Sequence, residues 1–581
     1  MKPFALVCLL CGLLAPCFAI DREAFTFTKY DLNVRIEAEQ QRLGARGSIT
    51  LRNDSQAPQK NVFLQISSSL NWRSIQAGNK AVQFVTQPYV SDIDHTGSVS
   101  EAIVSLPQAV APKASVELQI AYEGTIALDV TRLKRIGVPE DVARHTDWDQ
   151  ISPAASAVRG IGYVAWYPVA TESVDLTEPD SSPVVLGRWT EREAESNFGV
   201  KLCQFASKQA DPQTSVLNDP PSNGVPSGME GEVENEGSMA CMNHEYAPLG
   251  RVAPSFALGP YTIVHNDAFD VYHLPGHNGG AEDYALASEL AGAFVQDWFG
   301  MQRQRMRTVD IADMQAAPYE SGTFLFTPLA SKDTRLAQLT AVHQFTHAAL
   351  PSPRPWIYEG AAHFAQAVFR EQQSGRQAAL DYMAQHRDAV IEAEKSRQEN
   401  DAASNSLINT TIPELYRTKA MYVWWMLRDV VGEAVLKKAL QAYDPEKDKA
   451  PAYMQQLLEG ESKHDLEWFF DDWVYRDRGL PDFRVASVIP RALVAGGAVF
   501  TITVENTGDA GAEVPVTLRT QAGDVTQKLL VPRKGKSSLR LESATPAREV
   551  VVNDGSVLES DPTNNVYKIP EQKEPAQPEQ Q

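Results

Sequence analysis

The amino-acid sequence predicts a multidomain α+β protein with an N-terminal β-sandwich-like domain, a mainly helical middle domain and a small C-terminal β-sandwich. Residues 21–130 alternate apolar and polar side chains, as half-buried strands do. From about residue 280 the apolar residues recur at helical spacing, and residues 485–568 return to short alternating segments between turn residues. We therefore expect three domains, at 20–265, 266–484 and 485–568.

The composition is that of a folded, acidic protein. Of the 581 residues, 43% are hydrophobic and 22% are charged, and the formal net charge is −21. This hydrophobic content supports buried cores, whereas the negative charge argues against nucleic acid or an anionic membrane as a partner. No segment after the N-terminus is long and apolar enough to cross a bilayer. We expect no nucleic-acid partner and no transmembrane span, and the sequence leaves the oligomeric state open.

The N-terminus has the layout of a secretory signal peptide. Lys2 is followed by the apolar run PFALVCLLCGLLAPCFA, which ends in small residues, an arrangement typical of export. We expect residues 1–19 to be removed and the mature protein to be periplasmic or extracellular. A membrane anchor is disfavoured because the run is short and lacks a basic flank after it. A lipid anchor on Cys17 is disfavoured by Pro16 just before it.

Two cysteines, Cys203 and Cys241, remain after the signal peptide. In an oxidising compartment the two cysteines of an exported chain usually pair, so we expect a disulfide between them. The alternative, two separate buried thiols, stays open. Neither cysteine neighbours another cluster of metal-binding residues, and we do not expect them to bind zinc.

The outer parts of the chain are predicted from their strand and turn patterns. GIGYVAWYPVA (160–170) and NFGVKLCQFA (197–206) are candidate strands, and SFALGPYTIVHND would close the N-terminal domain. Residues 211–238 are rich in Pro, Gly, Ser, Asn and Glu, which predicts a long, acidic, exposed loop. Residues 569–581 are polar and Pro-rich, and predict a disordered tail.

The centre of the chain predicts a metal site. Residues 332–350 form a helix without internal Gly or Pro, which places His343 and His347, four residues apart, on one face. Two prolines end this helix, and a second can begin near Pro355, where proline is favoured in the first turn. Glu359 on the second helix could supply a third ligand. Two histidines, one glutamate and an open fourth position are the ligand set of a catalytic zinc site.

Gln344 occupies the position at which a zinc peptidase carries its general base. In the H-E-x-x-H motif the glutamate takes a proton from the attacking water. A glutamine can hydrogen-bond that water but cannot accept its proton. Loss of a general base usually costs roughly a hundred- to ten-thousand-fold in rate. The sequence therefore predicts a metal site whose peptidase activity is in doubt.

Several segments resemble the aminopeptidase N family of gluzincin zinc peptidases, and the resemblance covers nearly the whole mature chain. HQFTH resembles the family's H-E-x-x-H helix, WIYEGAAHF its W-L-x-E-G-x-A segment, LYRTKAMYVWWMLRDVVG its Tyr-containing helix, and DLEWFFDDWVYRDRGLPDF its closing signature. The resemblance implies a thermolysin-like zinc domain with one Zn²⁺ ion on His343, His347 and Glu359. It also implies that Glu320, in APYESGTFLF, binds the substrate amine and that Tyr416 donates to the oxyanion.

The sequence departs from the family pattern in three places. Gln344 replaces the base. Only eleven residues separate His347 from Glu359, fewer than is usual in the family. Tyr416 lies one residue further from the Met-Leu pair than the pattern expects, and Tyr422 is a weaker candidate for its role.

Two functions are compatible with these features. The first is an exported zinc metallopeptidase-like protein that hydrolyses peptide bonds, with free N-termini as candidate sites and Gln344 orienting the water. The second is an inactive zinc-binding pseudopeptidase that holds a peptide or protein ligand without cutting it, which the loss of the base favours. A zinc-free structural role is a third and weaker alternative.

Overall fold

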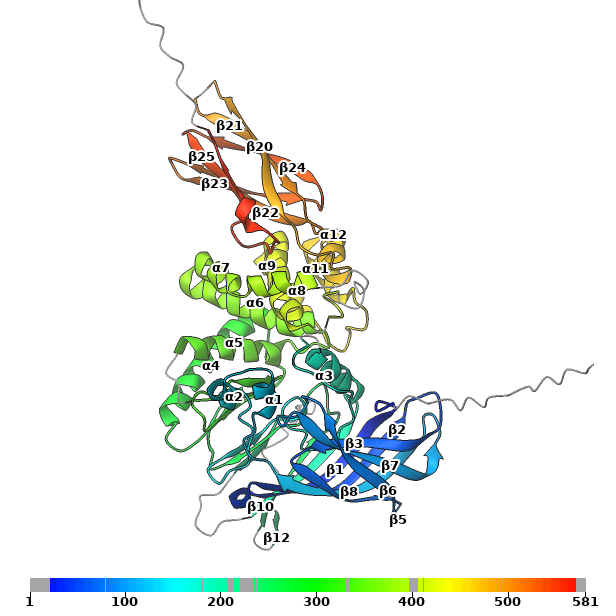
Figure 1. Ribbon diagram of the computed structural model, residues 1–581. Coiled ribbons are helices and arrows are strands. Elements are labelled where there is room, and N and C mark those ends of the chain that lie inside the picture. Colours follow the sequence, from blue (N-terminus) through cyan, green and yellow to red (C-terminus); the bar gives the residue numbers. More distant parts are fainter. Residues whose placement is uncertain are drawn as a thin grey trace, which may run out of the picture.

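The computed structural model describes residues 21–78, 80–178, 181–205, 214–218, 234–236, 239–329, 334–396, 406–410, 412–494 and 496–570. It confirms the predicted fold class: β-sheets at the N-terminal end, a helical middle region and β-sheets at the C-terminal end (Figure 1). The predicted signal peptide 1–19 and residues 571–581 of the predicted tail lie outside the described residues. In the described part of the chain no helix has the length and apolar character that crossing a bilayer requires.

The N-terminal region is built from strands that share one buried core. An eight-stranded sheet has the order β12-β13-β10-β1-β2-β8-β4-β5, and a three-stranded sheet has the order β3-β7-β6. Apolar side chains of both sheets form one cluster, as in a sandwich. The strands are β1 (Phe25–Glu37), β2 (Arg42–Asn53), β3 (Gln59–Ser67), β4 (Leu70–Ala77), β5 (Lys80–Ala81), β6 (Gln83–Val90), β7 (Ser98–Val110), β8 (Ser115–Thr125), β10 (Asn197–Phe205), β12 (Glu234–Glu236) and β13 (Met239–Tyr246).

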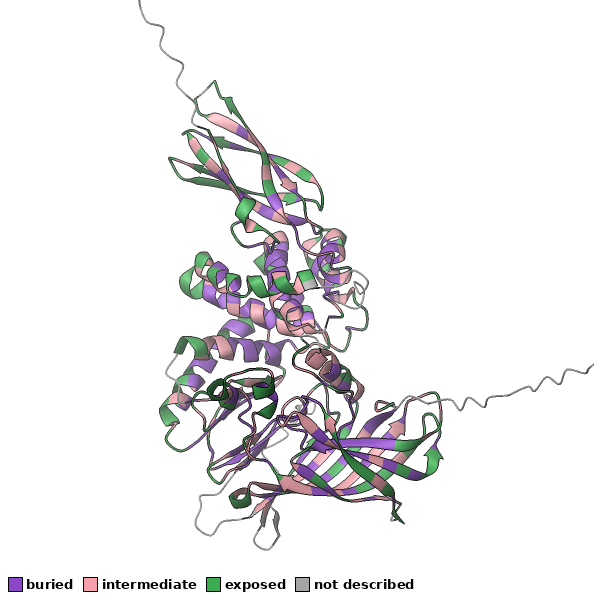
Figure 2. Ribbon diagram, in the orientation of Figure 1, coloured by how far each residue is buried: buried purple, intermediate pink, exposed green. Residues whose placement is uncertain are grey.

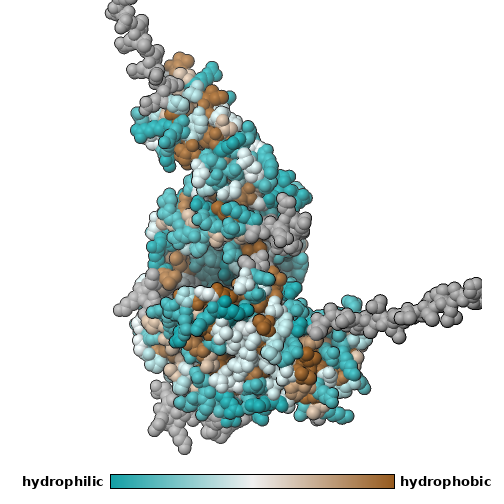
Figure 3. Space-filling view, in the orientation of Figure 1, coloured by the Kyte–Doolittle hydropathy of each residue, from teal (hydrophilic) through white to brown (hydrophobic). Residues whose placement is uncertain are grey.

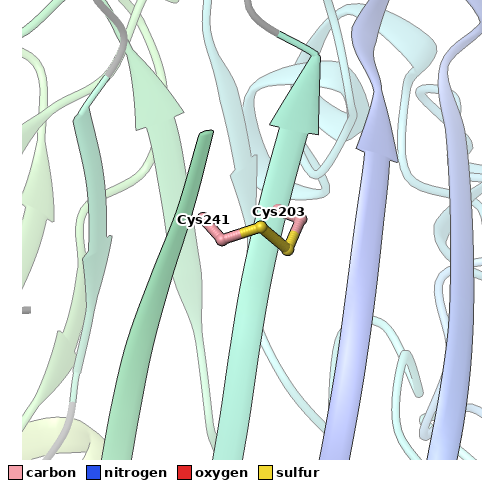
Figure 4. The surroundings of a disulfide bond; sticks show 2 residues. All are labelled: Cys203 and Cys241. Carbon is pink, nitrogen blue, oxygen red and sulfur yellow. A yellow bond between two sulfur atoms is a disulfide. The ribbon is translucent and has the colours of Figure 1, made fainter. Parts of the chain in front are cut away.

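The two cysteines lie on neighbouring strands of the large sheet. Cys203 on β10 is directly opposite Cys241 on β13, and the two sulfur atoms are bonded (Figure 4). Both side chains are buried. The bond ties β10, which pairs in parallel with β1, to β13 on its other side.

Two predictions for residues 131–265 need correction. Residues 160–170 are buried but form no strand: Gly160, Gly162 and Pro168 interrupt the regular backbone, and the segment meets β3 only through single hydrogen bonds such as Gln65 N to Val169 O. Within the expected loop 211–238, the described residues 214–217 form a buried strand, β11, because SVL is an apolar segment in the polar stretch, and residues 234–236 form β12. Residues 211–213, 219–233 and 237–238 of this prediction lie outside the described residues. A small sheet of order β11-β14-β9 collects β11 (Thr214–Leu217), β14 (Phe256–Gly259) and β9 (Ser156–Val158), and three helices complete this part, α1 (Thr131–Arg135), α2 (Glu140–Thr146) and α3 (Ser181–Arg192).

The middle region combines a mixed sheet with helices. Its five strands have the order β15-β16-β17-β19-β18 and are β15 (Thr262–His265), β16 (Phe269–His273), β17 (Met306–Asp310), β18 (Tyr319–Ser321) and β19 (Phe324–Thr327). The first of them pairs with β16, so this sheet starts before the domain boundary expected at residue 265. The helices are α4 (Asn278–Phe299), α5 (Thr334–Ala349), α6 (Pro355–Ser374), α7 (Arg376–Ala384), α8 (Arg387–Ser396), α9 (Ala420–Val431), α10 (Glu433–Ala442), α11 (Tyr453–Ser462) and α12 (Glu467–Phe470), with π-helical turns η3 (Glu414–Lys419) and η4 (Asp471–Tyr475).

The C-terminal region is a small two-sheet unit that packs on the helices. One sheet has the order β20-β21-β24 and the other β23-β22-β25-β26, with β20 (Phe483–Ala492), β21 (Ala498–Asn506), β22 (Ala512–Thr520), β23 (Asp524–Val531), β24 (Lys536–Ser543), β25 (Ala547–Val552) and β26 (Val566–Lys568). Its apolar core is continuous with that of the helices, and the indole of Trp473 donates to Gly511 O at 2.8 Å across the junction. The buried residues follow the inner faces of strands and helices (Figure 2). The face seen in Figure 3 is largely hydrophilic, as the acidic composition leads one to expect.

Candidate metal centre

Two packed helices bring the predicted histidines and Glu359 together. His343 and His347 lie one turn apart on α5, and α6 begins with Pro355 in its first turn and carries Glu359. The helices pack against each other. His347 is fully buried and its ring stacks on that of Tyr358, with ring centroids 3.8 Å apart. This packing fixes the imidazole, which is what a preformed ligand site requires.

The distances between the donor atoms fit a tetrahedral zinc ion. The Nε2 atoms of His343 and His347 lie 3.0 Å apart, so both face the same point. Carboxylate oxygens of Glu359 lie 3.9 Å from the first of these nitrogens and 3.7 Å from the second. Two ligands about 2.0–2.1 Å from a zinc ion at a tetrahedral angle are separated by roughly 3.3 Å. The three residues therefore fit the ion that the sequence predicts.

A fourth donor, Glu320, lies even closer to the two histidines. It stands on the edge strand β18, and its carboxylate oxygens are 3.2 Å from His343 Nε2 and 3.6 Å from His347 Nε2. Glu320, His343 and His347 form one group of potential metal ligands. The family resemblance implies that Glu320 binds the substrate amine, and this role stays a prediction. The structure places this carboxylate against the imidazoles themselves.

A fifth residue, His363, extends the cluster along α6. It lies one turn after Glu359, and together with His343 these two residues form a second group with metal-ligand spacing. The rings of His343 and His363 are 4.9 Å apart. The i+4 spacing from Glu359 was the only sequence signal for this placement.

Burial and neighbouring charges shift the histidine pKa values in opposite directions. Burial lowers the pKa of His343, but Glu320 and Glu359 outweigh burial and hold that pKa above its ordinary value. Burial, aided by His343, lowers the pKa of His347 to about 3. His347 is therefore neutral near pH 7, the form in which imidazole binds a metal.

Gln344 points into the protein core. Its side chain is fully buried, and its Oε1 accepts hydrogen bonds from the Tyr284 hydroxyl at 2.8 Å and from Thr308 Oγ1 at 3.4 Å. Tyr284 belongs to α4 and Thr308 to β17, so the amide oxygen is occupied by groups of the scaffold. In the described part of the chain its Nε2 has no hydrogen-bond partner. The sequence could not reveal this orientation, because the same position in the motif is compatible with either direction.

Tyr416 lies in the π-helical turn η3, half-buried near Glu359. Burial, to which Glu359 adds, raises the pKa of its hydroxyl, which stays protonated and able to donate near neutral pH. A π-helix closes i→i+5 hydrogen bonds and so takes up one residue more than an α-helical turn. Tyr422, the weaker candidate, is 1% exposed within the core of α9.

Arg417 was not identified from the sequence. Its Nε donates to Glu359 Oε2 at 3.1 Å, and its guanidinium lies 5.5 Å from the centre of the Tyr416 ring. Burial lowers the pKa of Arg417, but Glu359, Tyr416 and Glu320 outweigh burial and raise it, so the side chain is a permanent cation at the site. A lone arginine on a helix carries no sequence signal that separates it from a solvated surface charge.

Comparison with known proteins gives similarity of fold alone. No family model and no curated protein matches the sequence. Among solved structures, a two-domain M1 zinc metallopeptidase, a point mutant bound to L-arginine, is 14% identical with a TM-score of 0.45, over 75% of this chain and 91% of that one. A mutant M1 zinc metallopeptidase from Deinococcus radiodurans is 15% identical with a TM-score of 0.44, over 78% of this chain and 94% of the other.

Proposed function

We propose that this protein is an exported zinc metallopeptidase-like protein that binds one Zn²⁺ ion and hydrolyses peptide bonds. The observation that carries the proposal is the convergence of donors from separate elements. The Nε2 atoms of His343 and His347 lie 3.0 Å apart and face carboxylates from α6 and from the edge strand β18. Buried, oriented imidazoles beside acidic groups suit a divalent cation better than any other ligand.

The residues of the site divide into ligands and groups that act on the substrate. His343, His347 and Glu359 would hold the ion, and a bound zinc ion would supply Lewis-acid polarisation of the peptide carbonyl and of a water molecule. Glu320 lies beside the same two nitrogens and would accept a hydrogen bond from the attacking water. Tyr416 would donate to the oxygen of the scissile carbonyl.

The second candidate function is peptide binding without cleavage, and a specific observation favours it. Carboxylate oxygens of both Glu320 and Glu359 lie within 4 Å of the Nε2 atoms of His343 and His347, and two imidazoles with two carboxylates would make up the four donors of a closed zinc site. If Glu320 is a ligand, no position is left for water. The protein would then present a bound metal and a peptide-binding surface, and the partner would be a peptide or protein that is not consumed.

The test combines metal content with turnover. We would measure zinc in the purified mature protein and assay mixed aminopeptidase and internally quenched peptide substrates. The variants are His347→Ala, Glu320→Gln and Gln344→Glu, with His464→Ala and Glu289→Gln as exposed controls. If the protein hydrolyses peptides, wild type should contain zinc and turn over substrate, and His347→Ala should lose both. Glu320→Gln should then lose turnover but keep its zinc.

The other outcomes separate the remaining possibilities. Zinc without turnover, together with weaker zinc binding in Glu320→Gln, would establish the four-ligand site and the binding function. We expect Gln344→Glu to leave turnover unchanged or lower, because its side chain would face Tyr284 and Thr308 rather than the metal. A protein that takes up no zinc would refute both functions.

A further inference from the structure

Arg417 brings a cation with spare hydrogen-bond donors to the edge of the candidate metal centre. Only its Nε is engaged, by Glu359 Oε2 at 3.1 Å, and among the described residues its two terminal nitrogens have no hydrogen-bond partner. The side chain is 47% exposed, whereas that of Glu359 is 18% exposed. The guanidinium therefore stands between a ligand of the metal and solvent, with donors left over for an incoming molecule.

The charges around the site favour an anionic ligand. Neutral imidazoles add no charge when they bind a metal. The carboxylates of Glu320 and Glu359 would formally balance the two charges of a zinc ion, and Arg417, which pairs with Glu359, adds a positive charge beside them. A ligand carboxylate would neutralise that charge and could take two parallel hydrogen bonds from a guanidinium. A free ammonium group would be repelled by it.

A preference for acidic ligands would have to come from Arg417, because the net charge of the whole protein opposes it. The chain carries a formal net charge of −21, and such a charge repels acidic molecules at long range. Short-range recognition by one guanidinium is screened less than the long-range repulsion when the site is partly buried. An acidic protein that still prefers acidic ligands would need a local cation, and Arg417 is in contact with the candidate metal site.

We propose that Arg417 makes the metal centre selective for peptides that carry a carboxylate next to the peptide group presented to the metal, and that it disfavours free N-termini. The inference rests on the proposed zinc-dependent function and holds whether the peptide is cleaved or only bound. The carboxylate has two possible sources, an acidic side chain within a chain or a free C-terminus. Arg417 acts here as a specificity-determining residue that contacts the ligand.

An alternative role for Arg417 is to hold Glu359 in place. Hydrogen bonds to a metal-ligating carboxylate orient it, and losing one typically weakens metal binding. The two roles differ in what a substitution changes. A positioning role alters zinc affinity and treats all peptides alike, whereas a specificity role alters the ratio between acidic and neutral peptides at constant zinc content.

The experiment measures peptide binding to the zinc-loaded full-length protein by calorimetry or by competition. The probes are four short peptides: one blocked at both ends with a central Asp, one with a free C-terminus, one blocked and neutral, and one with only its N-terminus free. The proteins are wild type, Arg417→Gln, Arg417→Lys and, as a matched control, Arg540→Gln on the exposed face of β24. Zinc content is measured for each sample.

We expect a carboxylate peptide to bind wild type roughly tenfold or more tightly than the neutral peptide, which is the contribution of a hydrogen bond to a charged group. That ratio should fall to about one in Arg417→Gln, persist in part in Arg417→Lys, stay unchanged in Arg540→Gln and shrink with added salt. The peptide with the larger ratio, Asp-containing or with a free C-terminus, identifies the source of the carboxylate.

Four results would overturn the proposal. A zinc-loaded wild type without preference, or a preference that survives in Arg417→Gln, refutes selectivity by Arg417 and leaves the metal-dependent function standing. Loss of zinc in Arg417→Gln with an unchanged ratio assigns the residue to positioning Glu359. A wild type that binds no zinc refutes the proposed function and this inference with it.

Discussion

Replacing Gly360 with alanine should displace the helix that carries Glu359. Gly360 follows Glu359 on α6, and a Cβ added there would overlap the Cβ of Ala420 and lie 3.3 Å from two atoms of the Trp424 ring. Non-bonded carbon atoms keep roughly 3.5 Å apart, so α6 and the start of α9 would have to separate by roughly 1 Å. Metal sites tolerate about 0.2 Å in their ligand distances.

We expect Gly360→Ala to lower the free energy of unfolding by about 1–3 kcal/mol, as overpacking of a core does. Zinc affinity should fall by roughly ten- to a hundredfold, the range for disturbing the groups around a metal ligand. Both quantities are measurable, by denaturant titration and by competition with a zinc chelator. Glycine is needed here for close approach of two backbones and not for its dihedral freedom.

Two further variants provide a control and a compensation test for this prediction. Gly460, on α11, has open space where a Cβ would be added, so Gly460→Ala should stabilise the protein by up to about 1 kcal/mol through helix propensity. Adding Ala420→Gly to Gly360→Ala removes the overlapping methyl group, and the two substitutions should compensate by about 0.5–3 kcal/mol in a double-mutant cycle. If Gly360→Ala matches wild type in stability and zinc affinity, the close approach inferred here is wrong.

Three further predictions concern stability. Burial raises the pKa of Glu559 to about 7 from an ordinary value of 4.5. The contribution of protonated Glu559 to the free energy of unfolding is therefore complete below pH 4.5 and is lost as the pH rises to 7, a loss of up to about 3 kcal/mol. The variant Glu559→Gln should show a flatter dependence of stability on pH. The disulfide closes a loop of 38 residues, and replacing Cys203 and Cys241 with serine should cost about 4 kcal/mol, a loss that reductant should reproduce in wild type. Lys419 is buried between Glu394 and Asp477, so Lys419→Met should lower the free energy of unfolding by about 3–5 kcal/mol. Lys438→Met, at an exposed position, should change it little, and denaturant titration measures both.

The order of the secondary structure could be predicted because local patterns decide it. The helix expected at 332–350 is α5 at Thr334–Ala349, and Pro355 begins α6 in its first turn. The end of α5 and the start of α6 both follow from proline, because its ring is excluded from a helix interior and accepted in the first turn.

The predictions of secondary structure failed where tertiary contacts determine the backbone conformation. Residues 160–170 are as apolar as a strand, but their glycines and a proline prevent a regular ladder, and the segment is held by single hydrogen bonds to β3. The strand β11 is only four residues long and owes its existence to pairing with β14. The π-helical turn η3 precedes α9, and apolar periodicity alone cannot distinguish such a turn from a shifted helix.

The candidate site shows why a motif position and a side-chain direction are different pieces of information. A glutamine such as Gln344 cannot accept a proton, and the structure adds that its amide oxygen accepts a hydrogen bond from Tyr284. The acidic group that faces the histidines comes instead from Glu320 on another element, 24 residues earlier in the chain. A candidate metal centre without a carboxylate at the Gln344 position therefore still has one beside its histidines. Whether that carboxylate binds the ion or the water decides between the two proposed functions, and the zinc content of Glu320→Gln reports on it directly.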